Sequence, residues 1–317
     1  MPIIQFIPKN ARTKVCETKN DTLFGFMRQL IKQLNDSGHE RTAETYNATL
    51  NSVARFTKGE DLKFDAINET WTITYEAYLR NNGVSANTSS FYMRILRATY
   101  NRATQQHLTI QQYPFRPVYT GVDKTAKRAI LLKEIRRIKE LNLMQDGNLE
   151  FARDLFLFSF YTRGMALVDM AHLTQDNLHD GRITYIRRKT GQKISIKWEK
   201  CMQDIINKYY QKKNRYLLPI ILKEGANERA QYKSRSAWIC AKLRIIGEMA
   251  HLEHPLTMYV ARHSWASIAR SSHVPISIIS EGMGHESELT TQIYLASFNY
   301  KEVDKANRRI INLLSCK

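Results

Sequence analysis

Three residues near the C-terminal end of the sequence are of types that suit phosphodiester chemistry. Arg262 opens an apolar-periodic run, His285 directly follows Gly284, and Tyr294 comes nine residues after that histidine. A phenol can act as a nucleophile, and cationic or N–H donors can hold the charge that develops on phosphoryl oxygens. The combination therefore favours nucleophilic attack on a phosphodiester, as in a DNA-cleaving site.

Taken singly, these residues are more often structural, because Gly-His pairs and tyrosines near helix ends commonly fill turns or cap cores. Together, the pattern of Arg262-His263, Gly284-His285 and Tyr294 resembles the C-terminal signature of the tyrosine recombinases, the phage-integrase family. In that family Arg-His is followed by Leu-Gly-His and then by the nucleophilic tyrosine. The resemblance covers essentially the whole chain, strongly over 151–294 and by pattern alone across the first part.

The resemblance implies that Tyr294 attacks the scissile phosphate and leaves a 3′-phosphotyrosine and a free 5′ hydroxyl, with no cofactor and no metal. Arg262 matches the second of the family's two arginines, and its fork of donors suits non-bridging phosphate oxygens. His285 matches the Gly-His position, where a ring nitrogen can donate to the same phosphate. Lys189 matches the family's hairpin lysine, the general acid toward the leaving 5′ oxygen; alternatively it is a solvated turn lysine.

One departure from the family pattern lies three residues before Arg262. The usual box is His-x-x-Arg-His, but this sequence has Tyr259 in place of the first histidine. Tyrosine can donate a hydrogen bond to phosphate, but it cannot act as an imidazole-type base near neutral pH. We therefore expect Tyr259 to contact the phosphate without shuttling a proton.

A second departure concerns the family's first arginine, which normally stands in a Thr-Gly-Leu-Arg-x-x-Glu box. Aligning Asp169 on the acidic residue puts Ala166 where arginine is expected, and Arg163 lies three residues earlier. If both positions are on one helix they share a face, so Arg163 can supply the missing charge. The alternative is that Arg163 pairs with Asp169 and only braces the fold. The arrangement looks like a variant branch of the family found on mobile elements and invertible DNA segments.

Composition points to a polyanionic partner. The 317 residues carry a net charge of +18 and 43% hydrophobic residues, enough for globular cores in two domains. Lys and Arg exceed Asp and Glu by 18 to 11 through residue 128 and by 30 to 19 beyond it, so both halves are basic, as a clamp around DNA requires. The four cysteines are scattered and indicate neither a disulfide framework nor a zinc site. With no leader or membrane-length apolar run, we expect a cytoplasmic protein.

The first part of the chain predicts a small four-helix bundle. Apolar stripes begin after the cap pair Asp21-Thr22 and recur over 43–54, 71–79 and 86–100. On the fourth stripe Arg94 and Arg97 lie partly off the apolar face, where they reach phosphates or form a solvated basic face.

Composition then divides the chain. Two prolines, a glycine and four basic residues, among them Lys127 and Arg128, predict a linker over 113–128 that runs along DNA. We expect a lead-in over 1–20, a helical DNA-binding domain over 21–112 and a catalytic domain over 129–317.

The catalytic part predicts a mainly α domain with one small sheet. Helical periodicity from 131 and from 149 gives way to period two around a turn at Thr190-Gly191, which is typical of a β-hairpin. Further helices are predicted near 199–213, 234–250, 262–272, 275–282, 286–295 and 301–314. With the resemblance, the expected fold is mainly α: a SAM-like four-helix core-binding domain followed by a mixed α/β tyrosine-recombinase catalytic domain.

These observations leave three functions open. The leading interpretation is a site-specific recombinase that acts as a tetramer on two sites in double-stranded DNA, is a monomer when free, and works with accessory DNA-bending proteins in some systems. The second is a non-catalytic DNA-binding protein of the same fold, and the third is a relaxer like the type IB topoisomerases. The lack of an arm-binding domain favours simple inverted repeats. Integration, excision, inversion and resolution stay undecided.

Overall fold

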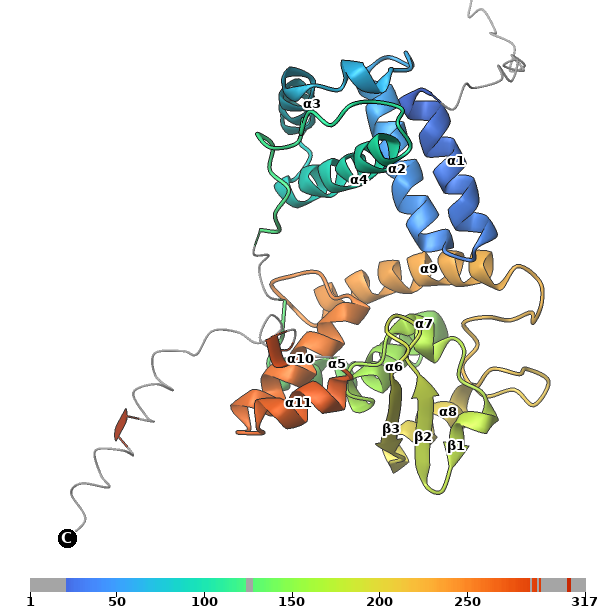
Figure 1. The fold of residues 1–317 in the computed structure, drawn as a ribbon. Helices are drawn as coiled ribbons and strands as arrows, with labels where there is room; N and C mark the ends of the chain where they lie inside the picture. Colours follow the sequence, from blue (N-terminus) through green and yellow to red (C-terminus); the bar gives the residue numbers. More distant parts are fainter. Residues whose placement is uncertain (1–20, 124–127, 286, 290, 292–306, 309–317) are drawn as a thin grey trace, which may run out of the picture. The chain divides into compact units, whose positions relative to one another are not determined.

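The computed structural model describes residues 21–123, 128–285, 287–289, 291 and 307–308, and divides the chain into two compact units at residue 125 (Figure 1). Several predicted features lie outside these residues: the lead-in over 1–20, Lys127 and Tyr294 wholly, and the expected helices over 286–295 and 301–314 in large part. No described helix has the length and apolar content needed to cross a membrane.

The first unit contains the four helices that the apolar stripes predict. They are α1 (Leu23–Asp36), α2 (Glu40–Phe56), α3 (Glu69–Asn81) and α4 (Ala86–Gln105), with a short 3₁₀ turn at Phe64–Ala66. Thr22, Asn68 and Ser85 cap α1, α3 and α4, because each side-chain oxygen accepts a hydrogen bond from a backbone N–H of the first turn. The core is rich in aromatic rings; the fully buried Tyr75 donates its hydroxyl to Ser52 at 2.8 Å.

The segment from residue 113, which composition predicts to be a linker, packs on this unit through its first part. Phe115 and Val118 are buried in the same core. The Thr72 hydroxyl donates to the Pro114 carbonyl at 2.6 Å, and Glu76 accepts a hydrogen bond from the backbone N–H of Tyr119. Apolar side chains in a proline-rich stretch thus make residues 113–123 part of the helical unit.

The second unit is built around α6 (Gly147–Tyr161). This helix is apolar on nearly all sides, so it is buried at the centre and packs against the helices on either side of it in the sequence as well as against distant ones. Its partners are α5 (Leu132–Glu140), α7 (Leu167–Met170), α8 (Lys200–Tyr209), α9 (Glu228–Met249) and α10 (Met258–Ser271). Helix α11 (Ile276–Met283) lies beside α10 (Figure 1).

The predicted hairpin is present as part of an antiparallel sheet in the order β1-β2-β3. Strand β2 (Arg182–Ile186) pairs with β3 (Lys193–Lys197). Every second residue of each strand is buried, and Ile183 of β2 pairs with Ile196 of β3 on this buried face. Strand β1 (Leu178–His179) has only two residues, too few for a period-two pattern, and was not predicted.

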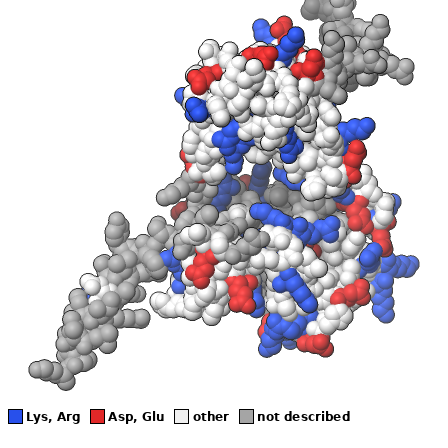
Figure 2. Space-filling model, in the orientation of Figure 1, with Lys and Arg blue, Asp and Glu red and all other residues white. Residues whose placement is uncertain are grey.

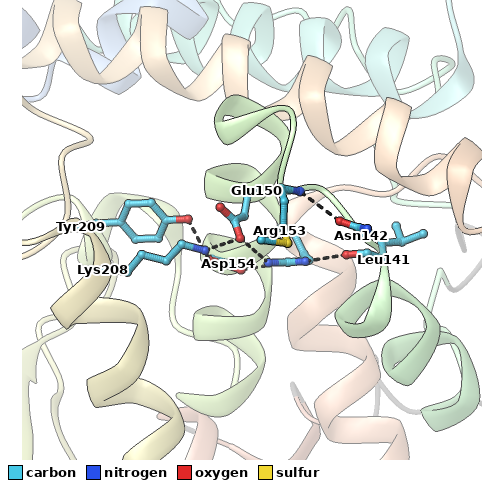
Figure 3. Close-up of polar contacts among 8 residues, drawn as sticks. Leu141, Asn142, Glu150, Arg153, Asp154, Lys208 and Tyr209 are labelled. Atoms are coloured by element: carbon cyan, nitrogen blue, oxygen red, sulfur yellow. Dashed lines mark hydrogen bonds and ion pairs between the residues drawn. The ribbon is translucent and has the colours of Figure 1, made fainter.

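A buried charge network fixes α6 to its neighbours (Figure 3). Asp154, which is 5% exposed, accepts hydrogen bonds from Arg153 at 2.9 Å, from Lys208 at 3.0 Å and from the Tyr209 hydroxyl at 2.7 Å. Arg153 also donates to the Leu141 carbonyl at 2.8 Å. Because Lys208 and Tyr209 belong to α8 and Leu141 follows α5, the network joins three segments at one carboxylate.

Candidate active site

Arg262 is held inside the second unit by two backbone carbonyls. It lies in α10, which begins four residues before the position that the sequence predicts, and it is 6% exposed. Nη1 donates to the Gly164 carbonyl at 2.9 Å, and Nη2 donates to the Met283 carbonyl at 2.6 Å. Both acceptors are main-chain oxygens, so these two hydrogen bonds orient the guanidinium without the help of a carboxylate.

His285 is placed by the end of α11. Gly284 takes a left-handed conformation with φ +61°, and the His285 N–H donates back to the Ser280 carbonyl at 3.0 Å, which closes the helix with a C-terminal cap. A β-carbon at Gly284 would lie 2.7 Å from Ile194 of β3. The turn that presents His285 therefore favours glycine for its left-handed conformation, and an added β-carbon would also require the Ile194 side chain to shift.

The structure brings Arg262 and His285 into direct contact. Nη2 of Arg262 lies 2.9 Å from Nε2 of His285, and Nδ1 of His285 lies 2.7 Å from the Thr291 hydroxyl. Because a guanidinium can only donate, Nε2 is the acceptor and the imidazole is neutral in this arrangement. Burial, followed by the charges of Arg262, Arg187 and Lys189, lowers the pKa of His285 to about 4.

Lys189 occupies the turn between β2 and β3, with its side chain exposed. The turn is closed by hydrogen bonds from the Arg187 N–H to the Gln192 carbonyl at 2.8 Å and from the Gly191 N–H to the Arg187 carbonyl at 2.8 Å. The Lys189 charge is the smallest of the causes that lower the pKa of His285, after burial and the charges of Arg262 and Arg187.

Arg187 is a member of this site that sequence reasoning missed. It is 8% exposed, and its Nη1 donates to the Gly284 carbonyl at 2.8 Å, next to His285. The signal was present in the period-two pattern, because Ile183, Tyr185 and Arg187 are alternate residues and all three are buried. The cluster of Arg188 and Lys189 beside it made the whole turn look solvated.

Arg163 and Ala166 are not on one helix, so that part of the sequence argument was wrong. Helix α6 ends at Tyr161, Arg163 and Gly164 have φ of +59° and +80°, and Ala166 is the extended cap residue before α7. The Arg163 side chain still lies close to the end of α11, because a β-carbon built at Gly282 would be 3.5 Å from the Arg163 Cδ. Gly282 is three residues before His285.

The alternative partner of Arg163 was Asp169. Asp169 is buried and accepts a hydrogen bond of 3.0 Å from the Arg188 backbone N–H. Arg163 and Asp169 are both described in the structure, and their side chains form no ion pair with each other. Burial raises the pKa of Asp169, against the lowering effect of that hydrogen bond and of nearby arginines. Asp169 thus supports the turn that carries Lys189.

The remaining site candidates lie in less enclosed positions. Tyr259, in the first turn of α10, is 55% exposed, with its ring edge-on to His263 at a centroid distance of 4.4 Å. Arg94 and Arg97 are exposed on α4 of the first unit, where Arg97 donates to the Thr120 hydroxyl at 3.2 Å, and Arg128 is exposed in the second unit. Figure 2 shows Lys and Arg on the visible surface of both units, interspersed with Asp and Glu.

Comparison with known families identifies the class. Residues 22–120 match the phage integrase SAM-like domain, and residues 130–300 match the phage integrase family. The chain therefore belongs to the phage integrase family. Its activity is site-specific DNA recombination by a tyrosine-type recombinase, and neither the non-catalytic binder nor the topoisomerase-like relaxer is favoured.

Individual relatives agree with this placement. The chain is 23% identical to tyrosine recombinase XerA of Thermococcus kodakarensis over 72% of its own length and 77% of the relative's. Among solved structures, lambda integrase bound as a dimer to a COC′ core site has a TM-score of 0.67 at 14% identity, covering 86% of this chain and 95% of that one. XerH recombinase bound to a palindromic difH substrate has a TM-score of 0.64 at 15% identity, covering 90% and 84%. At these identities the solved structures establish the shared fold.

Proposed function

We propose that this recombinase cuts and rejoins duplex DNA at paired sites through a 3′-phosphotyrosyl intermediate on Tyr294. The observation that carries the proposal is the direct contact between Arg262 and His285, residues 23 positions apart, at the place where the family signature requires them. Buried donors held in advance by the fold stabilise developing phosphoryl charge at little cost in reorganisation.

Each remaining residue takes a role that its position supports. Arg262 binds the non-bridging phosphate oxygens, and Lys189, exposed on its turn, protonates the leaving 5′ oxygen. Arg163, beside the His285 turn, supplies the charge of the family's first arginine, and Tyr259 donates a hydrogen bond to the phosphate from its hydroxyl. His285 accepts from Arg262 through Nε2 and so orients this guanidinium toward the phosphate; direct donation from His285 to the phosphate is a later step that requires a proton on Nε2.

The two units divide the work of DNA binding. The helical unit, including the segment through residue 123, forms the core-binding domain, and the unit beyond residue 128 forms the catalytic domain. Arg94, Arg97, Lys127 and Arg128 contact phosphates, so both units grip the duplex. Solved relatives include a lambda integrase tetramer bound to a Holliday junction, and we propose the same stoichiometry here, with the free chain a monomer.

We place the biological role on a mobile or invertible DNA element. A Tn1549 transposon integrase in complex with a circular intermediate DNA has a TM-score of 0.62 at 15% identity, covering 89% of this chain and 99% of that one. Integration, excision and inversion use the same strand chemistry and differ only in where the two sites lie and which way they point. Accessory DNA-bending proteins belong to the same proposal.

A suicide substrate tests the chemistry. Duplexes carrying inverted repeats from the DNA that flanks the gene, nicked near the crossover, trap the covalent complex because the cut end diffuses away. The native chain should form a denaturation-resistant adduct, and Tyr294→Phe should form none while it binds the same duplex with nearly unchanged affinity. An adduct with the Phe variant would place the nucleophile at another residue.

A further inference from the structure

His285 is held at both ring nitrogens, and the second partner is not among the residues that the family signature supplies. Nε2 faces the Arg262 guanidinium at 2.9 Å, while Nδ1 faces the Thr291 hydroxyl at 2.7 Å. Thr291 is fully buried, and it lies three residues before Tyr294 in the sequence. The imidazole therefore stands between the guanidinium and a residue close along the chain to the nucleophile.

The chemistry of these partners fixes the proton. Arg262 has only N–H groups to offer, so Nε2 presents its lone pair, and a neutral imidazole with that lone pair carries its hydrogen on Nδ1. The Thr291 hydroxyl then accepts the Nδ1 hydrogen, since a hydroxyl can both donate and accept. Hydrogen bonding at one ring nitrogen generally decides the state of the other.

We infer that Thr291 is a positioning residue for recombination: its hydroxyl accepts from Nδ1 of His285 and so keeps the bare Nε2 on Arg262, whose guanidinium is thereby oriented toward the phosphate. This inference rests on the proposed function. Without the hydroxyl, the Nδ1 hydrogen is buried with no acceptor at that position, which favours the other tautomer or a rotated ring. The other tautomer puts a hydrogen on Nε2 where Arg262 needs an acceptor, and a rotated ring moves Nε2 away, so either change breaks the bond with Arg262.

Two substitutions separate the hydroxyl from the shape of the side chain. Thr291→Val keeps the branched shape and removes the hydroxyl, whereas Thr291→Ser keeps the hydroxyl. On the suicide substrate we expect the Val variant to cleave about tenfold more slowly, the effect of one lost hydrogen bond of about 1.4 kcal/mol, and the Ser variant to stay within about twofold of the native rate. Thr99→Val, at an equally buried threonine of the first unit, controls for the loss of a buried hydroxyl.

A spectroscopic readout reports the tautomer directly. Correlation spectra of protein with nitrogen-15-labelled histidine at neutral pH distinguish Nδ1–H from Nε2–H, and the His285 signal is assigned by its disappearance in His285→Gln. We expect Nδ1–H in the native chain and in Thr291→Ser, and a mixture or the Nε2–H form in Thr291→Val. Nε2–H in the native chain would overturn the inference.

A double-mutant cycle tests whether Thr291 acts through His285. In a His285→Gln background the added Thr291→Val change should cost nothing further, because the ring that it positions is absent. An undiminished tenfold loss in that background, equal loss in Val and Ser variants, or native-rate cleavage by Thr291→Val would each overturn the inference. Such outcomes leave the proposed function standing, which fails only if the native chain forms no adduct through Tyr294.

Discussion

The carbonyl oxygen of Gly164 accepts a hydrogen bond of 2.9 Å from Arg262, and a β-carbon at Gly164 would lie 2.5 Å from Cγ of that same arginine. Gly164 thus accepts a hydrogen bond from the guanidinium and, because it has no side chain, leaves room for the aliphatic part of the Arg262 side chain. It also has φ of +80°, a conformation that other residues rarely adopt. The turn after α6 and the start of α10 can approach each other only with glycine at this point.

Gly164→Ala should therefore damage both stability and cleavage. The added carbon meets backbone and side-chain atoms of Arg262, so we expect about 1–3 kcal/mol of destabilisation from strain and overpacking. Adduct formation should fall more than tenfold in the folded protein. Urea unfolding and suicide-substrate cleavage measure the two effects. Gly147→Ala is the matched control, because nothing lies within 4 Å of its added carbon, and it should be neutral or slightly stabilising.

Stability should fall on acidification in a window set by His285. Folding lowers the pKa of this imidazole from 6.5 to about 4, so between these values the unfolded chain binds more protons than the folded one. The stability that the folded chain gains from keeping His285 neutral is fully present above pH 6.5 and is lost as the pH falls toward 4. Melting temperatures of the native chain and of His285→Gln, compared from pH 7.5 to 4, should converge as pH drops. Parallel curves would contradict the shift.

The alanine variant of Arg163 tests whether this residue supplies the charge of the family's first arginine. Loss of a donor that stabilises phosphoryl charge costs about 10²–10³-fold in rate. We expect Arg163→Ala to remain folded, bind DNA and lose cleavage to this extent. Restoration of part of the rate by Ala166→Arg would show that the family's usual position can still serve. Native-rate cleavage by Arg163→Ala would remove Arg163 from the site.

Arg187→Ala is expected to act on both structure and rate. It leaves the Gly284 carbonyl without its donor, which costs about 1–3 kcal/mol of stability and loosens the turn before His285. It also removes a buried charge next to the phosphate site, so cleavage should fall at least tenfold. Arg188→Ala, which removes an exposed charge from the same turn, should lower cleavage by less than threefold in the same assay.

The buried network at Asp154 should matter for folding and not for chemistry. Asp154→Asn removes the buried one of the two carboxylates that Arg153 and Lys208 share, while Glu150 still pairs with both cations, so the variant should cost about 1–3 kcal/mol in urea unfolding. Cleavage at low temperature should be native in the folded fraction. Glu199→Gln removes one partner of an exposed 3.6 Å pair and should cost less than about 0.5 kcal/mol.

Binding by the helical unit should be electrostatic in origin. Arg94→Ala removes an exposed cation from α4, so it should weaken duplex binding similarly for all sequences and reduce the slope of log affinity against log salt by about one. Fluorescence anisotropy over a series of salt concentrations measures both effects. An unchanged slope would place Arg94 away from phosphate.

Local signals predicted most of the elements, and tertiary contacts account for the misses. Thr22 and the stripe after it indicated α1, and the alternation around Gly191 indicated the hairpin. The sequence could not reveal that Phe115 and Val118 enter a core, because the two prolines and the glycine near them are typical of a linker. Sequence spacing also suggested a common helix for Arg163 and Ala166, whereas α6 ends at Tyr161 and the next turn contains two successive residues with positive φ, Arg163 and Gly164. Contacts between distant segments, such as Arg187 with Gly284, have no local signature.

Three main-chain oxygens hold the two buried guanidinium groups: those of Gly164 and Met283 for Arg262, and that of Gly284 for Arg187. Every residue type supplies a carbonyl, so these acceptors depend on the backbone path and not on a side-chain functional group. Alanine scanning cannot delete them, and Met283 can change its side chain while it still orients Arg262. The site should therefore tolerate side-chain changes at Met283, whereas Gly164 and Gly284 have positive φ and close contacts that restrict them to glycine. Insertions or deletions should be harmful at all three positions, because they shift the carbonyl groups themselves.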